Sequence, residues 1–338
     1  MATEYAGGSG SFNYYTYLGE RLPSHDGSAA DDFTTLVGNN GGSWLGHPVV
    51  LQHWRNTPAG LRLTRNSTAV LRGTPPQFSG ACAASGPQQR CGLAQGGTIV
   101  RDSEGSLVAA FTGFASDGPT LCKPNEAGWK HCYTLAFYRS PDHGSTWNYM
   151  SRLDQTQAMP SAVEGPCEPT LALLADGRLM VMFRLMSGVN LWQAFSDTGA
   201  RTWTEPTQSV AWAVWPQLLR LSSGVLALSS GRPGIGLWLS ADGAGEHWEY
   251  HSVCAEHNRH LPAESGLRYN AQMANVSSNS SSQGPSPGQT TSYTSLVEVS
   301  PGVVMLQYDR MRVGCTGTAD LCGRDFVFSM RIRIDKNS

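Results

Sequence analysis

Charged residues are scarce in this chain. Lysine and arginine total 24 and aspartate and glutamate 26 of 338 residues, or 15%, against about 25% in an average soluble domain. The net charge is −2 and there is no long basic run, which argues against a nucleic-acid-binding surface. No apolar stretch approaches the roughly 18 residues of a membrane-spanning helix. Helical periodicity is also lacking, and the composition excludes a coiled coil.

Turn-forming and aromatic residues are abundant. The chain has 38 glycines, 19 prolines, 10 tryptophans and 11 tyrosines, and 40% of its residues are apolar. The apolar content argues against wholesale disorder. Many turns between short apolar runs are typical of an all-β globular protein, which is the fold class that we predict.

The cysteines predict the compartment. Residues 1–18 contain neither a basic n-region nor an apolar h-region, so they do not resemble a signal peptide. Three cysteine pairs each bracket a short segment, as local disulfides do in an oxidising compartment: Cys82 and Cys91, Cys122 and Cys132, Cys315 and Cys322. Cys167 and Cys254 remain for a long-range pair. We therefore expect a secreted or lumenal protein; eight thiols in a cytoplasmic protein are the alternative.

One short pattern, Ser-x-Asp-x-Gly-x-Thr-Trp, recurs along the chain. The clean copy is Ser140–Trp147, and degraded copies occupy residues 196–203, 240–248 and 37–44. The Asp side chain can accept hydrogen bonds from turn amides, Gly supplies a positive φ, and Trp packs beneath. Each copy therefore predicts a β-hairpin turn. A metal-binding loop is less favoured because each copy supplies at most one acidic group at the key position.

The spacing of the copies predicts the architecture. Their closing tryptophans lie about 50 residues apart, or about twice that, which suits a four-stranded propeller blade. We therefore expect residues 1–338 to form a single domain, a six-bladed β-propeller with an incomplete first blade. The Ser/Gly/Pro-rich segment 276–289 is expected to be a flexible loop within the sixth unit.

Several polar residues stand at the ends of predicted apolar strands. Glu168 lies in Glu168-Pro169-Thr170 ahead of Asp176-Gly177-Arg178-Leu179 and Arg184. Tyr293 precedes Pro301-Gly302 and Tyr308-Asp309, and Arg232 lies just upstream of the turn at Ser240. Together with the repeated turn, these segments resemble the sialidase (neuraminidase) superfamily of six-bladed propellers, over about residues 15–334.

The resemblance implies a retaining exo-glycosidase that removes terminal sialic acid or a related nonulosonic acid. It implies that Tyr293 is the nucleophile, that Glu168 is its base and that Asp26 is the acid/base group. Carried over in the same way, the carboxylate-binding arginines are Arg184, Arg232 and Arg21, and Asp309 supports the site. No cofactor or metal is expected. The expected partners are sialylated or other acidic glycans, with no nucleic acid or membrane span, and the protein is expected to be a monomer.

The residue types suit this chemistry. Arginine forks bind a carboxylate bidentately, and a neutral tyrosine is not repelled by that carboxylate as a carboxylate nucleophile would be. An adjacent base is needed because the phenol pKa lies near 10.

Alternatives remain at several positions. Asp31 and Asp32 are rivals of Asp26, and Asp309 could simply pair with a neighbouring arginine. His251, His257 and His260 with Cys254 superficially resemble zinc ligands, although we read their segment as a surface strand and loop. Two other functions also stay open: a catalytically weak or inactive glycan-binding propeller, and a purely structural interaction propeller.

Overall fold

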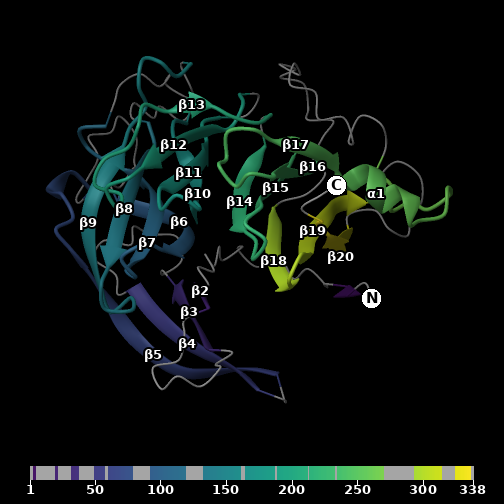
Figure 1. Cartoon of the computed structure of the whole chain (residues 1–338), viewed down its shortest axis with the longest axis horizontal. Helices are drawn as coiled ribbons and strands as arrows, with labels where there is room; N and C mark the ends of the chain where they lie inside the picture. Colours follow the sequence, from purple (N-terminus) through teal and green to yellow (C-terminus); the bar gives the residue numbers. More distant parts are fainter. Residues whose placement is uncertain are drawn as a thin grey trace. The chain divides into compact units, whose positions relative to one another are not determined.

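The computed structural model (Figure 1) describes residues 3–4, 20–21, 32–37, 49–57, 60–78, 92–118, 132–160, 164–186, 189–211, 213–232, 234–269, 293–313 and 324–335. The chain forms two compact units, each described by itself below. Unit 1 comprises Met1–Ser11, Met182–Gln193 and Thr207–Ser338, and unit 2 comprises Phe12–Val181 and Ala194–Pro206.

Unit 2 contains an eight-stranded sheet. Its order is β2-β3-β4-β5-β9-β8-β7-β6, so that two consecutive four-stranded groups join through β5 and β9. These two strands pair in parallel, with Val70 opposite Thr146, whereas the other neighbours are antiparallel. The strands are β2 (Glu20–Arg21), β3 (Asp32–Val37), β4 (Val49–Thr57), β5 (Gly60–Arg72), β6 (Gly92–Arg101), β7 (Leu107–Phe114), β8 (Thr134–Ser140) and β9 (Thr146–Leu153); a 3₁₀ turn, η1, covers Pro76–Phe78.

A four-stranded sheet follows in chain order. Its order is β10-β11-β12-β13. The strands are β10 (Cys167–Leu173), β11 (Leu179–Arg184), β12 (Trp192–Ser196) and β13 (Thr207–Gln208). The hairpin between β10 and β11 closes through the Leu174 amide, which donates to the Arg178 carbonyl at 2.8 Å.

The described part of unit 1 forms two four-stranded sheets and one helix. The first sheet, β14-β15-β16-β17, is a simple antiparallel meander. The second has the order β1-β20-β19-β18, so an N-terminal strand completes a C-terminal sheet. The elements are β14 (Val214–Arg220), β15 (Leu226–Gly231), β16 (Ile235–Ser240), β17 (Glu249–Ser252), α1 (Val253–Arg259), β18 (Thr294–Ser300), β19 (Val303–Val313), β20 (Arg324–Arg333) and β1 (Thr3–Glu4).

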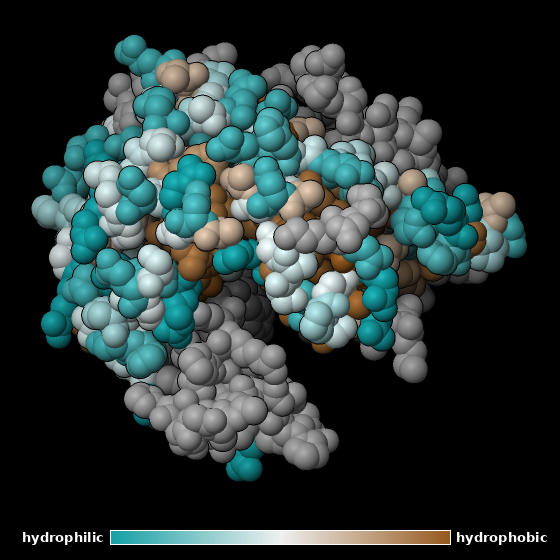
Figure 2. Space-filling view, viewed as in Figure 1, coloured by the Kyte–Doolittle hydropathy of each residue, from teal (hydrophilic) through white to brown (hydrophobic). Residues whose placement is uncertain are grey.

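Burial falls from the inner to the outer strands of a sheet. All six residues of β15 are buried, whereas β17 has three exposed residues and one half-buried residue. A strand buried on both faces needs an apolar run rather than an alternating pattern, which explains Leu226–Ala227–Leu228 in β15. Apolar clusters form around Phe111, Tyr138 and Trp147 in unit 2 and around Leu237, Val304 and Leu306 in unit 1. On the face of the molecule in Figure 2, most coloured residues are hydrophilic, and hydrophobic residues are visible in the gaps between them.

The Ser140–Trp147 repeat forms the predicted hairpin turn, between β8 and β9. The Ser140 hydroxyl accepts a hydrogen bond from the Gly144 amide at 2.8 Å, and the Asp142 carboxylate accepts one from the Thr146 amide at 2.7 Å. The fully buried Trp147 donates its indole N–H to the Gly144 carbonyl at 2.8 Å. Burial alone would raise the pKa of Asp142, but the hydrogen bonds from Thr146 and Ser140 outweigh it and hold the pKa below its usual value.

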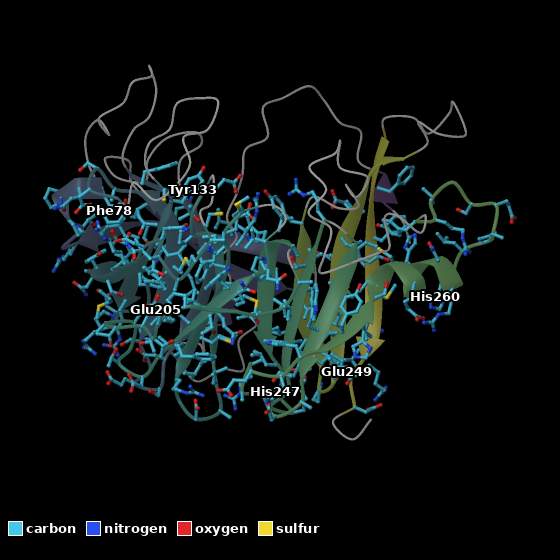
Figure 3. The ribbon with its side chains drawn as sticks, turned by 90° about the horizontal axis from the view of Figure 1, so that it is seen from above. Phe78, Tyr133, Glu205, His247, Glu249 and His260 are labelled. Carbon is cyan, nitrogen blue, oxygen red and sulfur yellow. The ribbon has the colours of Figure 1, made fainter. Side chains whose placement is uncertain are left out.

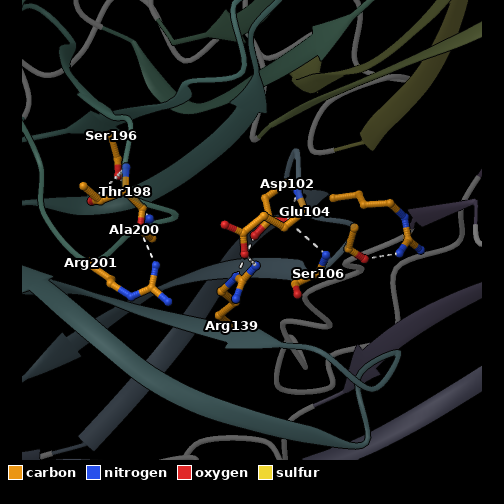
Figure 4. Close-up of polar contacts among 10 residues, drawn as sticks. Asp102, Glu104, Ser106, Arg139, Ser196, Thr198, Ala200 and Arg201 are labelled. Carbon is orange, nitrogen blue, oxygen red and sulfur yellow. Dashed lines mark hydrogen bonds and ion pairs between the residues drawn. The ribbon is translucent and has the colours of Figure 1, made fainter.

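The degraded copies keep the same turn with substituted groups. At Ser196–Trp203, the Thr198 hydroxyl takes the carboxylate's place and accepts from the Thr202 amide at 2.9 Å. The Ala200 amide donates to the Ser196 hydroxyl at 3.0 Å, as the Gly144 amide does to Ser140 in the clean copy (Figure 4). Ala200 there adopts φ +66°, although it has a side chain. In the third copy the Gly245 amide donates to the Ser240 hydroxyl at 3.1 Å across the extra residue. The hairpin prediction is confirmed for these three copies; the turn of the fourth, at 37–44, lies outside the described residues.

Two expectations need correction, and one receives support. Cys167 and Cys254 are buried thiols rather than half-cystines, so their predicted long-range pair is wrong. Cys132 is disulfide-bonded, in line with the local pairs, whose other cysteines lie outside the described residues. The segment around Cys254 forms the helix α1 rather than a strand and loop. Ser252 caps this helix by accepting a hydrogen bond from the Ala255 amide at 3.2 Å, and Val253, Cys254 and His257 are its buried residues.

Candidate functional site

Arg232, Tyr293 and Asp309, three residues singled out by the sequence, lie at the ends of two strand pairs in unit 1. In the β14–β15 pair, Val214 is opposite Gly231, so Trp215 near the start of β14 and Arg232 just after β15 lie at the same end. In the β18–β19 pair, Thr294 is opposite Tyr308, which places Tyr293 opposite Asp309 one residue further on. The register of each antiparallel pair therefore gathers these side chains at strand ends.

Arg232 and Tyr293 come together in unit 1. The guanidinium carbon of Arg232 lies 5.6 Å from the centroid of the Tyr293 ring, and the Trp215 ring meets the Tyr293 ring edge-on at 5.0 Å. Both contacts are within the range of cation–π and aromatic pairing. An arginine held over a tyrosine puts a permanent positive charge beside a phenol, an arrangement suited to an anionic ligand.

Buried hydroxyls lock the strands that carry these residues. Ser229 on β15 and Thr294 at the start of β18 share a hydrogen bond of 2.9 Å between their side-chain oxygens. Ser230 donates to the Val214 carbonyl at 2.6 Å and so ties β15 to β14. Because these bonds are buried and directly adjoin Tyr293 and Arg232, they fix the spacing of the pair.

The backbone is strained at three of these strand ends. Among the described residues, five without the freedom of glycine have positive φ, and two of them, His143 and Ala200, belong to repeated hairpin turns. The others are Glu168 at +50°, Trp215 at +43° and Arg232 at +56°, and each precedes a proline. An L-residue in the left-handed region costs energy, and such outliers concentrate at functional sites. This strain is an independent reason to examine these residues.

Glu168 is held by unit 2. Its side chain is buried, with 6% of the residue exposed, and its backbone amide donates to the Thr112 hydroxyl at 3.0 Å. The backbone at Gly165, three residues before Glu168, packs closely on Cys132, since a Cβ at Gly165 would lie 2.7 Å from the Cβ of Cys132. Tyr133, labelled in Figure 3, fixes the same loop, because its amide donates to the Glu164 carbonyl at 2.7 Å. Glu168 is thus a buried carboxyl on a rigid strand start.

The other predicted site residues have varied positions. Arg184 is the half-buried last residue of β11. Arg21 lies on β2, opposite Phe33, and its side chain is outside the described residues. Asp26 also lies outside them, as do its rivals Asp31 and the side chain of Asp32. The structure therefore joins Arg232 directly to Tyr293, with Asp309 at the same strand end, and describes Glu168 within its own unit.

The histidine cluster has other roles. His257 is buried and contacts the Tyr308 hydroxyl through Nδ1 at 2.9 Å and the Leu267 carbonyl through Nε2 at 3.2 Å. Burial also raises the pKa of the Tyr308 hydroxyl. His251 lies 3.4 Å from Glu249, and His260 lies 3.1 Å from Glu256. Within the described ranges, no group of three or more His, Cys, Asp or Glu side chains could hold a metal ion. His257 thus anchors α1 to the strand that carries Asp309.

Trp215 is the residue that sequence reasoning missed. Its Trp-Pro pair at the start of β14 repeats the Glu168-Pro169 pattern at the start of β10. Both residues combine positive φ with a following proline, although proline normally drives the preceding residue to extended conformations. A comparison of strand starts between units could therefore have found Trp215.

Comparisons with known proteins agree with this strand arrangement. Residues 114–306 match the family model described as a BNR repeat-like domain. None of the curated proteins matches the chain. In the part of the chain that the structure describes, no helix is long and apolar enough to cross a membrane.

Solved structures of several glycosidases share the fold. An exo-β-1,3-galactanase from Clostridium thermocellum is 11% identical with a TM-score of 0.52, covering 99% of this chain and 63% of that one. A xylan β-1,4-xylosidase from Bacillus halodurans is 14% identical with a TM-score of 0.51, covering 94% and 53%. A Hadza microbial sialidase is 15% identical with a TM-score of 0.50, covering 89% and 49%. The chain spans between about half and two thirds of each of these proteins, and the likeness shows the mostly-β propeller fold alone.

Proposed function

The chain belongs to the family of BNR repeat-like domains, and from this premise we propose that it is a retaining exo-glycosidase that removes terminal sialic acid, or a related nonulosonic acid, from glycoconjugates. The observation that carries the proposal is the placement of Arg232 over Tyr293 at 5.6 Å. The proposed reaction needs a cationic group that binds the carboxylate of the sugar and a tyrosine that attacks the sugar. A phenol beside a fixed guanidinium supplies both. The positive φ of Arg232 and Glu168 adds weight, because strain of this kind is kept where function needs it.

The proposed first step forms a glycosyl–tyrosine bond. The Tyr293 oxygen attacks the anomeric carbon while its proton passes to a carboxylate base, the role that the resemblance assigns to Glu168, and the bond from that carbon to the departing glycan breaks. Asp26 gives its proton to the leaving oxygen. Arg184, Arg232 and Arg21 bind the sugar carboxylate, and Asp309 supports the arginines from the strand end opposite Tyr293.

The second step restores the site. Asp26 takes a proton from water, whose oxygen attacks the anomeric carbon as the bond to Tyr293 breaks. Glu168 then returns its proton to the phenolate. Two displacements at one carbon leave its configuration unchanged. The arginines bind the carboxylate throughout, each bidentate pair contributing about 1.5–3 kcal/mol.

We further propose that the described sheets are blades of a six-bladed propeller, and that the protein is secreted or lumenal. The consecutive four-stranded groups support the first statement, and the disulfide at Cys132 supports the second. A catalytically inactive glycan-binding propeller is the competing function, because the same arginines could bind a sugar acid without hydrolysis.

The test is release of 4-methylumbelliferone from its α-sialoside. We expect turnover by the wild-type chain and a loss of about a thousandfold or more in kcat for Tyr293→Phe, which keeps the ring and removes the nucleophilic oxygen. Tyr149→Phe is the matched control, since Tyr149 lies on β9 in unit 2 and is not one of the proposed site residues. The released sugar should first appear with retained configuration by NMR.

Two outcomes would overturn the enzyme. Turnover by Tyr293→Phe equal to wild type would remove Tyr293 from the mechanism. No turnover by the wild-type chain, with retained affinity for sialosides that Arg232→Ala abolishes, would establish the glycan-binding protein instead.

A further inference from the structure

Unit 1 contains a recess whose lining does not include Arg232, Trp215 or Tyr293. It has a volume of about 330 Å³ and lies between the outer strands β12–β13 of one sheet and β16–β17 of the next. This volume is at the lower end of the range for small-molecule sites. Its lining combines three aromatic rings with polar side chains, chiefly Trp238, Trp248, Tyr250, Gln193, Ser209 and Glu246.

The aromatic wall is built by strand register. Trp238 on β16 is directly opposite Tyr250 on β17, and their ring centroids are 5.3 Å apart with planes inclined at 50°. Gly236 makes room for the indole, because a Cβ at this glycine would lie 2.4 Å from the Trp238 ring. A glycine inside a strand often marks such a close approach. The glycine at position 236 of β16 therefore leaves the space that the Trp238 ring occupies.

Trp248 completes this wall from the repeated turn. Its indole N–H donates to the Gly245 carbonyl at 3.0 Å, which fixes the orientation of the ring. His247 and Glu249, labelled in Figure 3, flank it along the chain. Tyr250 is 40% exposed, so its ring remains accessible at the mouth of the recess.

The lining of the recess also includes two polar side-chain atoms without a hydrogen-bond partner among the described residues. Gln193 is 6% exposed, yet its Oε1 has no hydrogen-bond partner among the described residues, and neither does Ser209 Oγ. Buried polar atoms in native structures almost always have partners, so two in one recess call for a ligand. The amide oxygen needs a donor, and a hydroxyl can both donate and accept.

We propose that this recess is a binding subsite for a neutral pyranose ring of an oligosaccharide. The C–H face of the sugar packs on the aromatic wall, and its hydroxyl groups bond to Gln193 and Ser209. Among the described residues that line the recess there is no lysine or arginine, and Glu246 is one of them, so an anionic sugar is disfavoured. The subsite does not depend on the proposed hydrolysis, because its residues are separate from that site.

The experiment is isothermal titration of the full chain with three neutral disaccharides: lactose, maltose and chitobiose. We expect at least one to bind the wild type, and we expect Gln193→Leu and Tyr250→Ala each to weaken that binding about tenfold or more. Tyr250→Phe keeps the ring and should restore the affinity. Gln307→Leu is the matched control for Gln193→Leu, since Gln307 is exposed on β19 outside the recess.

The outcomes separate this subsite from the proposed active site. Arg232→Ala should leave the affinity for the disaccharide unchanged, whether or not the protein hydrolyses sialosides. If Gln193→Leu does not fold, the exposed Tyr250 variants decide the question alone. The subsite is refuted if none of the three disaccharides binds at about 10 mM, a concentration that detects affinities weaker than millimolar, or if Tyr250→Ala binds as tightly as wild type.

Discussion

Replacing Arg232 by glycine and, separately, by alanine would separate the cost of its backbone conformation from the role of its guanidinium. Both variants lose the contact with the Tyr293 ring, so that loss cancels when the two are compared. Both keep the backbone amide, which donates to the Gly234 carbonyl at 3.0 Å. What differs is how each residue tolerates φ +56°.

The expected size follows from two opposing costs. An L-residue in the left-handed region costs roughly 1–2 kcal/mol, which alanine bears and glycine does not. Glycine loses more backbone entropy on folding, about 0.5–1 kcal/mol relative to alanine. The glycine variant should therefore be the more stable by about 0.5–1 kcal/mol.

An ordinary arginine position supplies the matched control. Arg220 ends β14, is exposed, and has no positive φ. There alanine should be more stable than glycine by about 0.5–1 kcal/mol. The order of the two variants should thus invert between Arg220 and Arg232, and the combined difference of about 1–2 kcal/mol measures the strain.

Urea unfolding of the four variants, followed by tryptophan fluorescence, gives this comparison. The urea midpoints can be compared only where the variants share the same dependence of unfolding free energy on urea concentration, since a changed slope would signal a changed unfolded state. If Arg232→Ala proves as stable as Arg232→Gly, the backbone at residue 232 is not strained. The positive φ of Arg232 then no longer supports a functional role. Loss of activity in both variants, with the glycine form near wild-type stability, would identify a residue kept for function at the expense of the fold.

Two further predictions concern the hairpin turn and the Glu168 loop. Asp142→Ala should lower the free energy of unfolding by about 1 kcal/mol at pH 7. The pKa of Asp142 is lower in the folded protein than its unfolded value of about 3.9, so the carboxylate stabilises the fold above that value and loses this effect as the pH falls through the folded pKa. The free energies of unfolding of wild type and variant should therefore converge in acid. A gap that persists at pH 2 would mean that the carboxylate charge is irrelevant. Gly165→Ala should be destabilised by about 2–4 kcal/mol, because φ is +90° and its Cβ would meet Cys132 at 2.7 Å. Gly105→Ala, with φ +83° and nothing within 4 Å, should lose only about 1–2 kcal/mol, and equal denaturation midpoints for the two alanine variants would contradict the packing argument.

Short-range features were the most predictable part of the fold. The hairpin at Ser140–Trp147 was readable because each of its hydrogen bonds joins residues within a few positions of one another. Even the substitution of Thr198 for aspartate preserves the turn, since a hydroxyl accepts the same amide bond. The helix α1 was not predicted, because seven residues are too few to establish a periodic pattern.

Features that depend on contacts between residues far apart in the sequence could not be predicted from local sequence patterns. Nothing in their own sequence separates Cys167 and Cys254 from a disulfide pair, because the distance between two cysteines is set by packing. The parallel pairing of β5 with β9 was likewise invisible, since it joins strands from consecutive four-stranded groups. The role of Trp215 became clear only from its contact with Tyr293.

The sequence alone determined the mostly-β class, the repeated hairpin turns and the candidate residues at strand ends, because turn chemistry and apolar runs are encoded within a few neighbouring positions. Only the tertiary structure decided that Arg232 lies over Tyr293, that Glu168 is buried in a strained conformation, and that Gln193 lines the same recess as Trp238 and Tyr250. These facts arise where separate strands pack together. Contacts of that kind depend on how many distant side chains share one space, which no local pattern records.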